Sequence, residues 1–400
     1  MRWKREIIDD YYFHILSFLL FSIVATAGFL VANYIIFTIG VIGITYFFMH
    51  NWYFKHVGNK LYFDNQKENI RLLVDEEGYL RLSFRNEGVA ILGATIRLTL
   101  KDVIRPTKMS ADQYVSGTIE VPVPFSLLKK EETVIKIPIL GVKRGTTRIL
   151  ELQINIPHLF GSGEVILTYS DIIQTQIYVF PSPAPFPARI EKKAIGLGEH
   201  PTINSLFVDR FQPIGTRDYI RGDRFQDIHW KTSARRQELQ TKVFAPSTKM
   251  EWMFAINLSD GRHGVTSQLE DYIKYTTYLM QQALDKNISF SLVVNVRSFG
   301  STPFLYLPSG SGPKHLQKAL ELLSIPSNNS MTIRFSIVLQ YALLHQLVPA
   351  VFVQAGKTTD EDEKILYQYN HRGVQILTLQ AFEDQGAIVP WQRSLKIASS

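Results

Sequence analysis

The chain of 400 residues contains no cysteine. This absence excludes disulfide bonds, thiolate nucleophiles and zinc or iron–sulfur sites built on cysteine. It leaves the compartment open, because a protein without disulfides can work on either side of a membrane. The sequence also lacks a phosphate-binding glycine loop, a nucleophile elbow and a zinc-binding helix motif. We therefore assign no cofactor, no small-molecule substrate and no catalytic residue from motifs.

Charged side chains are missing from one long stretch, since no Asp, Glu, Lys or Arg occurs between Tyr11 and Phe54. At about 1.5 Å per residue this run is too long for one crossing of a hydrocarbon core of about 30 Å and suits two. It predicts a two-helix transmembrane hairpin over residues 1–54, with helices at 13–31 and 34–51. Basic residues precede and follow it, which predicts a two-pass protein of the cell membrane with cytoplasmic soluble domains.

Two other interpretations of this stretch are less favourable. A signal peptide cleaved after Ala27 fits the small residues there, but Glu6, Asp9 and Asp10 disrupt the basic region that such peptides carry. A buried helical hairpin of a soluble domain does not fit apolar residues on all faces. The net charge of +7 favours anionic neighbours, without choosing among lipid, nucleic acid and an acidic protein.

Short runs with alternating apolar and polar residues fill residues 55–180. In Tyr79–Arg85, for example, Leu80, Leu82 and Phe84 share one face of a strand. Several such runs separated by Gly, Pro and Asn predict an all-β domain, an antiparallel β-sandwich. A proline-rich linker at 181–188 follows, because each proline restricts the backbone and removes a donor.

Residues 189–245 hold the most unusual chemistry of the chain. Acids and bases alternate around an imidazole and an indole, so the segment can pair internally. A short helix from Arg224, capped by Asp223, would bring Asp227 and Lys231 together at i, i+4. The alternation over Leu239–Val243 predicts a strand after it. Its signature residues are Arg217, Asp218, Tyr219, Gly222, Asp223, Asp227, His229, Trp230, Lys231, Ser233 and Arg235.

This order of residues resembles the signature of the bacterial domain-of-unknown-function family 58. Members of that family often accompany MoxR-type AAA+ ATPases and transglutaminase-like membrane proteins, so the resemblance implies an adaptor with such a protein partner.

Three interpretations of the signature segment stay open. Its arginines and aspartates can form a polar clasp between domains, with Trp230 buried. Trp230 and the arginines can instead form an exposed contact site for a partner. In a catalytic interpretation, His229 with Asp223 or Asp227 acts as base and orienter or binds a metal. The interleaved acids argue against nucleic acid.

Residues 246–400 alternate apolar strands with helices, which predicts an open, mostly parallel sheet covered on both faces. We expect strands at 250–258, 289–296, 304–307, 350–354 and 375–379. We expect helices at 268–285, 314–323, 333–344 and 360–371.

With the signature upstream, this region resembles the von Willebrand factor A-like part of family 58 members. That fold carries a magnesium site at the end of its first strand. The corresponding positions here are Asn257, Ser259 and Gly261, so the first carboxylate is an amide and the last hydroxyl is missing. We therefore predict a degenerate site without metal, although Asp260 could replace the lost acid after a shift of one residue.

The sequence thus predicts a membrane-anchored cytoplasmic interaction protein. One alternative is a metal-dependent hydrolase that uses Asp223, Asp227 and His229. Another is a binder of anionic lipid or nucleic acid.

Overall fold

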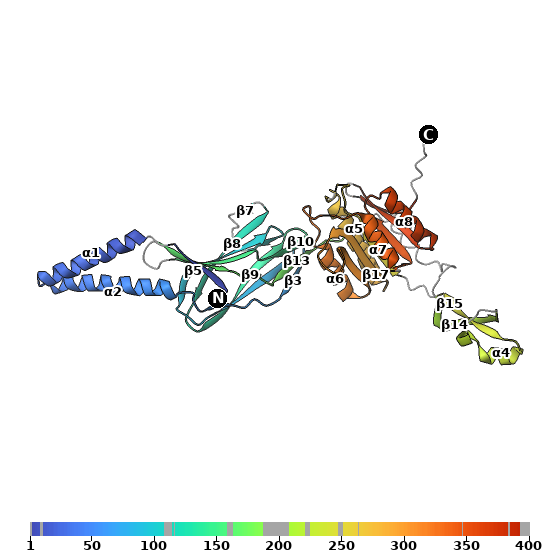
Figure 1. The fold of residues 1–400 in the computed structure, drawn as a ribbon, viewed down its shortest axis with the longest axis horizontal. Coiled ribbons are helices and arrows are strands. Elements are labelled where there is room, and N and C mark those ends of the chain that lie inside the picture. Colours follow the sequence, from blue (N-terminus) through green and yellow to red (C-terminus); the bar gives the residue numbers. More distant parts are fainter. Residues whose placement is uncertain are drawn as a thin grey trace, which may run out of the picture. The chain divides into compact units, whose positions relative to one another are not determined.

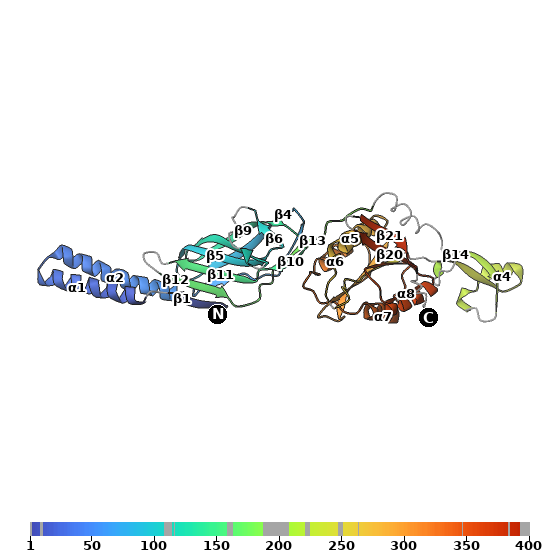
Figure 2. The ribbon, with the colours of Figure 1, turned by 90° about the horizontal axis from the view of Figure 1, so that it is seen from above.

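The computed structural model describes residues 2–8, 11–107, 114–115, 117–157, 163–186, 208–220, 225–246, 251–262, 264–345, 347–382 and 385–392. The chain divides into two compact units, Met1–Phe180 and Pro181–Ser400. The first combines two long helices with β-sheets, and the second contains a six-stranded sheet with helices and a two-stranded sheet (Figures 1 and 2).

Two apolar helices near the N-terminus, α1 (Tyr11–Leu30) and α2 (Tyr34–His56), lie side by side (Figure 1). Glycine permits their close approach, because a Cβ atom at Gly40 would lie 2.5 Å from the backbone nitrogen of Ala25. Asn33 caps α2 by accepting hydrogen bonds from the backbone of its first turn. Among the described residues, α2 is long and apolar enough to cross a membrane, with α1 contributing a shorter apolar stretch.

Helix α2 ends five residues later than the predicted 34–51. The reason lies in its last turns, where Phe54 is only 6% exposed and belongs to the core of the β-sheets. Nearby, the Tyr53 hydroxyl donates a hydrogen bond to the Ala90 carbonyl (2.9 Å), and Arg5 Nη1 donates to the Lys55 carbonyl (2.8 Å). The helix therefore runs directly into the sheets instead of joining them through a free linker.

Residues 3–180 form sheets with the strand orders β1-β12-β11-β5-β8-β7, β2-β4-β9-β6 and β10-β13-β3. Their bounds are β1 Trp3–Ile8, β2 Leu61–Phe63, β3 Asn69–Leu73, β4 Glu77–Asn86, β5 Ile91–Lys101, β6 Ile104–Pro106, β7 Tyr114–Val115, β8 Thr118–Leu127, β9 Glu131–Gly141, β10 Gly145–Arg148, β11 Glu151–Pro157, β12 Glu164–Tyr169 and β13 Gln176–Phe180.

These sheets share a single apolar core. The apolar residues of the alternating runs in the sequence supply its side chains. In β4, Leu80, Leu82 and Phe84 are buried, and the Phe84 ring lies 5.1 Å from that of Phe125 in β8. Buried aromatic pairs of this kind add to the area that the strands remove from water. One pairing differs from the antiparallel prediction, because β3 and β13 run parallel.

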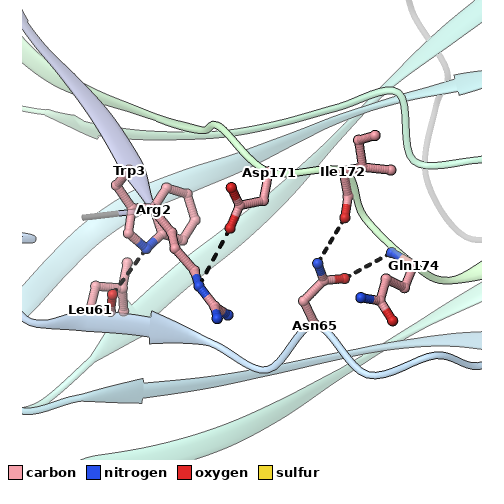
Figure 3. Close-up of polar contacts among 7 residues, drawn as sticks. All are labelled: Arg2, Trp3, Leu61, Asn65, Asp171, Ile172 and Gln174. Atoms are coloured by element: carbon pink, nitrogen blue, oxygen red, sulfur yellow. Dashed lines mark hydrogen bonds and ion pairs between the residues drawn. The ribbon is translucent and has the colours of Figure 1, made fainter.

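The residues expected as the basic flank of the first helix form strand β1 instead, paired antiparallel with β12. Figure 3 shows how this segment is held. Trp3 Nε1 donates to the Leu61 carbonyl (2.9 Å), and Arg2 Nε lies 3.4 Å from an Asp171 carboxylate oxygen. In the same region Asn65 accepts from the Gln174 backbone at 2.8 Å. Both ends of the helix pair are thus attached to the same β-domain.

The second unit is built on a mixed sheet with the order β18-β17-β16-β19-β20-β21. Its four central strands are parallel, and the two edge strands are antiparallel to their neighbours. The elements in chain order are β16 Glu251–Ile256, α5 Leu269–Asp285, β17 Ser289–Arg297, β18 Phe304–Gly310, α6 Pro313–Leu323, α7 Phe335–Leu344, β19 Val351–Ala355, α8 Asp360–His371, β20 Gln375–Phe382 and β21 Gln385–Pro390.

Alternate residues of the central strand supply two separate cores. Trp252, Phe254 and Ile256 pack with α5 and α6, whereas Met253 and Ala255 pack with α7 and α8. A strand buried on both faces explains why this stretch is apolar without alternation. The predicted helices agree with the observed ones to within two residues, while β21 had no counterpart in the prediction.

Candidate functional site

The described part of the signature segment forms a small module of its own. Strands β14 (Val208–Asp218) and β15 (Gln240–Pro246) pair antiparallel, with Asp218 opposite Gln240. Between them lie a 3-10 turn, η2 (Phe225–Asp227), and a short helix, α4 (Trp230–Arg236). We call this module the signature hairpin. Figure 1 labels its elements β14, β15 and α4.

Helix α4 begins later than the sequence predicted, and its N-cap is His229. The Nδ1 atom of His229 accepts a hydrogen bond from the Thr232 backbone N–H (3.1 Å) and lies 2.9 Å from the Thr232 hydroxyl. Because Nδ1 accepts from a backbone donor, it carries no proton in this arrangement. The predicted helix start at Arg224 and the proposed cap Asp223 lie outside the described residues, as does Gly222.

The buried polar interior of the signature hairpin is made by Ser233 and Gln240, and the exposed Asp218 is hydrogen-bonded to it. Ser233 is 8% exposed, donates to the His229 carbonyl (3.0 Å) and accepts from the Gln240 backbone N–H (2.8 Å). The buried Gln240 side chain donates to Asp218 Oδ1 at 2.7 Å. These bonds fasten α4 to β15 and β15 to the end of β14. Signature residues Ser233 and Asp218 therefore hold the module together.

Other signature residues face solvent. Trp230 is 56% exposed and meets Phe225, 73% exposed, edge to face at 5.3 Å. Lys231 and Arg235 are exposed on α4, Arg217 is exposed at the end of β14, and Tyr219 follows with its backbone bonded to Leu239. We call Phe225 and Trp230 the aromatic pair. Large apolar side chains left in water beside cations are typical of contact sites.

The described geometry does not assemble a base and an orienting acid. The Nδ1 atom of His229 is committed to the first turn of α4. Asp227 lies in the 3-10 turn, so it does not share a helix with Lys231 as the predicted i, i+4 pair required, and no ion pair joins these two described residues. Within the described ranges no cluster of three or more His, Asp or Glu side chains is arranged to hold a metal.

The predicted degenerate metal site lies at the carboxyl ends of β16 and β17, where the structure places an amide pair, Asn257 and Asn295. Asn257 is 4% exposed and Asn295 is fully buried. Asn295 Nδ2 donates to Asn257 Oδ1 (2.7 Å) and to the Ile333 carbonyl (2.9 Å), while its Oδ1 accepts from the Leu258 backbone (2.7 Å).

The lone pairs that a cation would need are used within the protein. Asn257 Oδ1 accepts from Asn295 and also from the Ser259 backbone (3.1 Å), and Ser259 Oγ accepts from the Gly261 backbone (3.1 Å). Asp260 Oδ1 accepts from the backbone of Arg262 (2.7 Å) and Gly264 (3.0 Å). The residues present therefore fit a closed hydrogen-bonded turn better than a hard cation, which prefers several free carboxylate oxygens.

Sequence reasoning missed Asn295 and Gln240, which complete the two networks. Asn295 is the one polar side chain near the end of the apolar strand Phe290–Val296, and Gln240 lies on the polar side of the alternation Leu239–Val243 that predicted β15. An isolated amide inside a buried strand was a usable signal, because a buried amide needs a hydrogen-bonding partner. Its partner could not be named without the sheet order.

Solved structures that resemble part of this chain do so at low identity. The CARDB domain of the PF1109 protein from Pyrococcus furiosus is 12% identical, covering 30% of this chain and 90% of that domain, with a TM-score of 0.17. The C-terminal domain of wzt is 12% identical over 31% of this chain and 80% of that domain, with a TM-score of 0.20. Likeness at this level supports no inference about fold or function.

One curated relative and one family model match the chain by sequence. The uncharacterized protein YeaD of Bacillus subtilis (strain 168) is 28% identical over 109 residues, which are 27% of this chain and 25% of YeaD. The chain thus spans about a quarter of that relative. Residues 215–399, from the signature hairpin through the α/β sheet, match the family described as protein of unknown function DUF58.

Proposed function

We propose that this protein is a membrane-anchored adaptor that binds a protein partner through the signature hairpin. The observation that carries the proposal is the aromatic pair. Phe225 and Trp230 stay in water although the hairpin has a hydrogen-bonded interior at Ser233 and Gln240. Aromatic and arginine side chains are over-represented among the residues that dominate binding energy at protein interfaces.

The anchor in this proposal is the pair of helices α1 and α2. Apolar side chains are exposed around both helices, including Leu16, Ile23, Ile42 and Met49. Exposing so much apolar surface to water is unfavourable, whereas a lipid bilayer would cover it. With about 1.5 Å per residue, α2 matches a hydrocarbon core of about 30 Å. Lys4, Arg5 and Lys55 at the outer ends favour a two-pass topology with the soluble units in the cytoplasm.

The α/β sheet supports the same assignment. Its chain order, 3-2-1-4-5-6 from β18 to β21, fits the von Willebrand factor A-like fold that the signature implies. At the end of the first strand of that sheet, Asn257 and Ser259 form a closed turn. We therefore assign this part to protein contact without a bound cation, and we take a MoxR-type AAA+ ATPase as the expected partner.

The test is capture of a purified MoxR-type ATPase by the full chain reconstituted in lipid nanodiscs. Trp230→Ala should weaken capture at least tenfold, because a central aromatic anchor contributes about 2 kcal/mol or more. The matched control is Tyr79→Ala on strand β4, since Tyr79 is 58% exposed and also aromatic. Equal capture by wild type and Trp230→Ala, or an equal loss in Tyr79→Ala, would remove the proposed contact site.

The membrane topology can be tested separately by protease accessibility. A protease added outside intact cells should leave the C-terminal unit uncut and should cut it after the membrane is permeabilised. Cleavage before permeabilisation would place the soluble units on the opposite side and reject the cytoplasmic adaptor.

A further inference from the structure

A basic pocket lies near the amide pair, at the carboxyl ends of β16 and β17. Its cavity is about 620 Å³, and Arg262, Arg297 and Arg334 line it from three different segments. We call it the arginine pocket. No ion pair joins any of these three arginines to an acid within the part of the chain that the structure describes. Three uncompensated guanidinium groups around one cavity create a positive potential that attracts an anion.

Hydrogen bonds hold the wall of this pocket in place. The Arg297 backbone N–H donates to the Met331 carbonyl (2.8 Å), and the Ile333 N–H donates to the Asn295 carbonyl (2.8 Å). On the other side, the Thr332 hydroxyl donates to the Gly264 carbonyl at 3.1 Å. A site formed before the ligand arrives loses less conformational entropy on binding. The buried amide pair thus acts as the support of the pocket.

Two acids, Asp260 and Glu361, keep their charge near these segments, but among the described residues neither forms an ion pair with the three arginines. Asp260 Oδ1 is occupied by two backbone N–H groups of the loop that carries Arg262. Glu361, at the start of α8, accepts from the Ser336 hydroxyl at 3.3 Å. Helix α7 also begins directly after Arg334, and the positive end of its dipole adds to the attraction for an anion.

The pocket also offers apolar surface. Met331 is 67% exposed and Ile337 is 45% exposed on its lining. Phe299 is 97% exposed close by in sequence, and the Arg297 guanidinium lies 5.9 Å from the centre of its ring. Such a cation–π contact orients the arginine and leaves the ring edge free for a ligand. A carboxylate ligand that is flanked by aliphatic side chains would match both the charge and the apolar lining.

We propose that the arginine pocket binds an acidic, aliphatic peptide segment of a partner protein directly, without a bridging metal ion. Guanidinium groups bind carboxylates through bidentate hydrogen bonds, so the contact is directional as well as strong. The apolar lining distinguishes this occupant from a free phosphate group, which carries no aliphatic surface. This inference rests on the proposed adaptor function and adds a second site with its own ligand chemistry.

The experiment uses the full chain in nanodiscs of neutral lipid and a fluorescein-labelled short peptide that alternates glutamate and leucine. Fluorescence anisotropy should show saturable binding, and peptides alternating glutamine or lysine with leucine should not bind. The double variant R297Q/R334Q should weaken binding about tenfold or more, because two charge-assisted contacts are lost. The matched control K314Q/K318Q removes two exposed charges from α6 and should bind as wild type does.

Hydrogen exchange of strand β17 checks that R297Q/R334Q is folded. Absence of saturable binding, or equal weakening in both double variants, would overturn the proposal. Displacement of the peptide by inorganic phosphate at matched ionic strength, at concentrations below those of unlabelled peptide, would assign the pocket to phosphate instead. Trp230→Ala should not affect peptide binding, so a failure of the pocket and a failure of the signature hairpin give different results.

Discussion

The signature hairpin and the carboxyl edge of the α/β sheet each contain an internal hydrogen-bond network, but the two networks differ in what they support. In the hairpin, a few hydrogen bonds around Ser233 support an aromatic pair that stays in water. At the sheet edge, Asn257 and Asn295 are buried and all their strong bonds stay inside the protein. The difference teaches that a network of polar residues can hold an exposed contact pair in place or can close a site within the protein, according to what surrounds it.

The same comparison separates residues within the signature. Ser233 and Asp218 are bonded to Gln240, and His229 caps α4. Trp230 is exposed against the likewise exposed Phe225, and Arg235 is exposed on α4. Substituting the first group should change stability, and substituting the second should change binding. The predictions below test this division, beginning with the largest expected effect.

The amide pair should be the most sensitive position. Asn295→Ala leaves the Leu258 N–H and the Ile333 carbonyl without this partner, and it removes one of the two hydrogen bonds that Asn257 Oδ1 accepts. Each buried group left unpaired costs about 1–3 kcal/mol, so we expect the sheet to lose about 3 kcal/mol or more. Hydrogen exchange of β16 and β17, followed with urea, measures the loss. Asn329→Ala, on an exposed loop of the same unit, should change stability by less than about 0.5 kcal/mol. A mild effect of Asn295→Ala would show that water replaces the amide.

The hairpin interior should respond less strongly. Ser233→Ala removes the acceptor for the Gln240 backbone N–H and a donor to His229, which should cost the hairpin about 1–2 kcal/mol. Faster hydrogen exchange of the Gln240 amide is the expected signal. Lys231→Ala, two residues earlier on the exposed side of α4, should leave that exchange rate unchanged. If both variants exchange alike, the Ser233 bond does not hold β15.

An acid at the sheet edge gives a smaller, pH-dependent effect. Burial raises the pKa of Asp362, which forms the capping box of α8 with Thr359. The native state therefore binds this proton more tightly than the unfolded state. The proton on Asp362 therefore stabilises the native state at low pH. This stabilisation is lost as the pH rises from the ordinary aspartate pKa near 4 through the raised pKa. Asp362→Asn should flatten the pH dependence of unfolding over that window, and Asp360→Asn, which is exposed, should not. An unchanged slope in Asp362→Asn would reject this account.

The smallest effect on stability is expected at the aromatic pair. Trp230→Ala should change the stability of the hairpin by less than about 0.5 kcal/mol, because more than half of this side chain is already in water. Hydrogen exchange of α4 and β15 is the measurement. Strong destabilisation would place Trp230 with Ser233 as a supporting residue and would support a clasp between domains.

Much of the secondary structure could be predicted because local patterns determine it. Alternation in Tyr79–Arg85 and the helical spacing of Leu269, Tyr272, Ile273 and Met280 identify elements that the structure contains. Strand β1 could not be predicted, since its partner β12 lies more than 150 residues away along the chain. The parallel pairing of β3 with β13 depends on the same kind of distant contact.

The candidate sites divide in the same way. The residue types of the signature were visible in the sequence, but whether Trp230 is buried or exposed was not. The arginine pocket was not predicted either, because Arg262, Arg297 and Arg334 are far apart in the chain and look like ordinary surface charges. The loop before α7 pairs with the end of β17, and this pairing brings the three arginines to one cavity.

The sequence by itself determined the uncharged N-terminal stretch, the β-rich and α/β character of the two units, and the presence of an amide instead of a carboxylate at Asn257. These follow from composition and short-range periodicity, which depend on the residues alone. The tertiary structure decided which polar groups satisfy one another and which stay in water. That outcome depends on strand order and register, because hydrogen bonds such as Asn295 to Asn257 join residues that only the folded sheet makes neighbours.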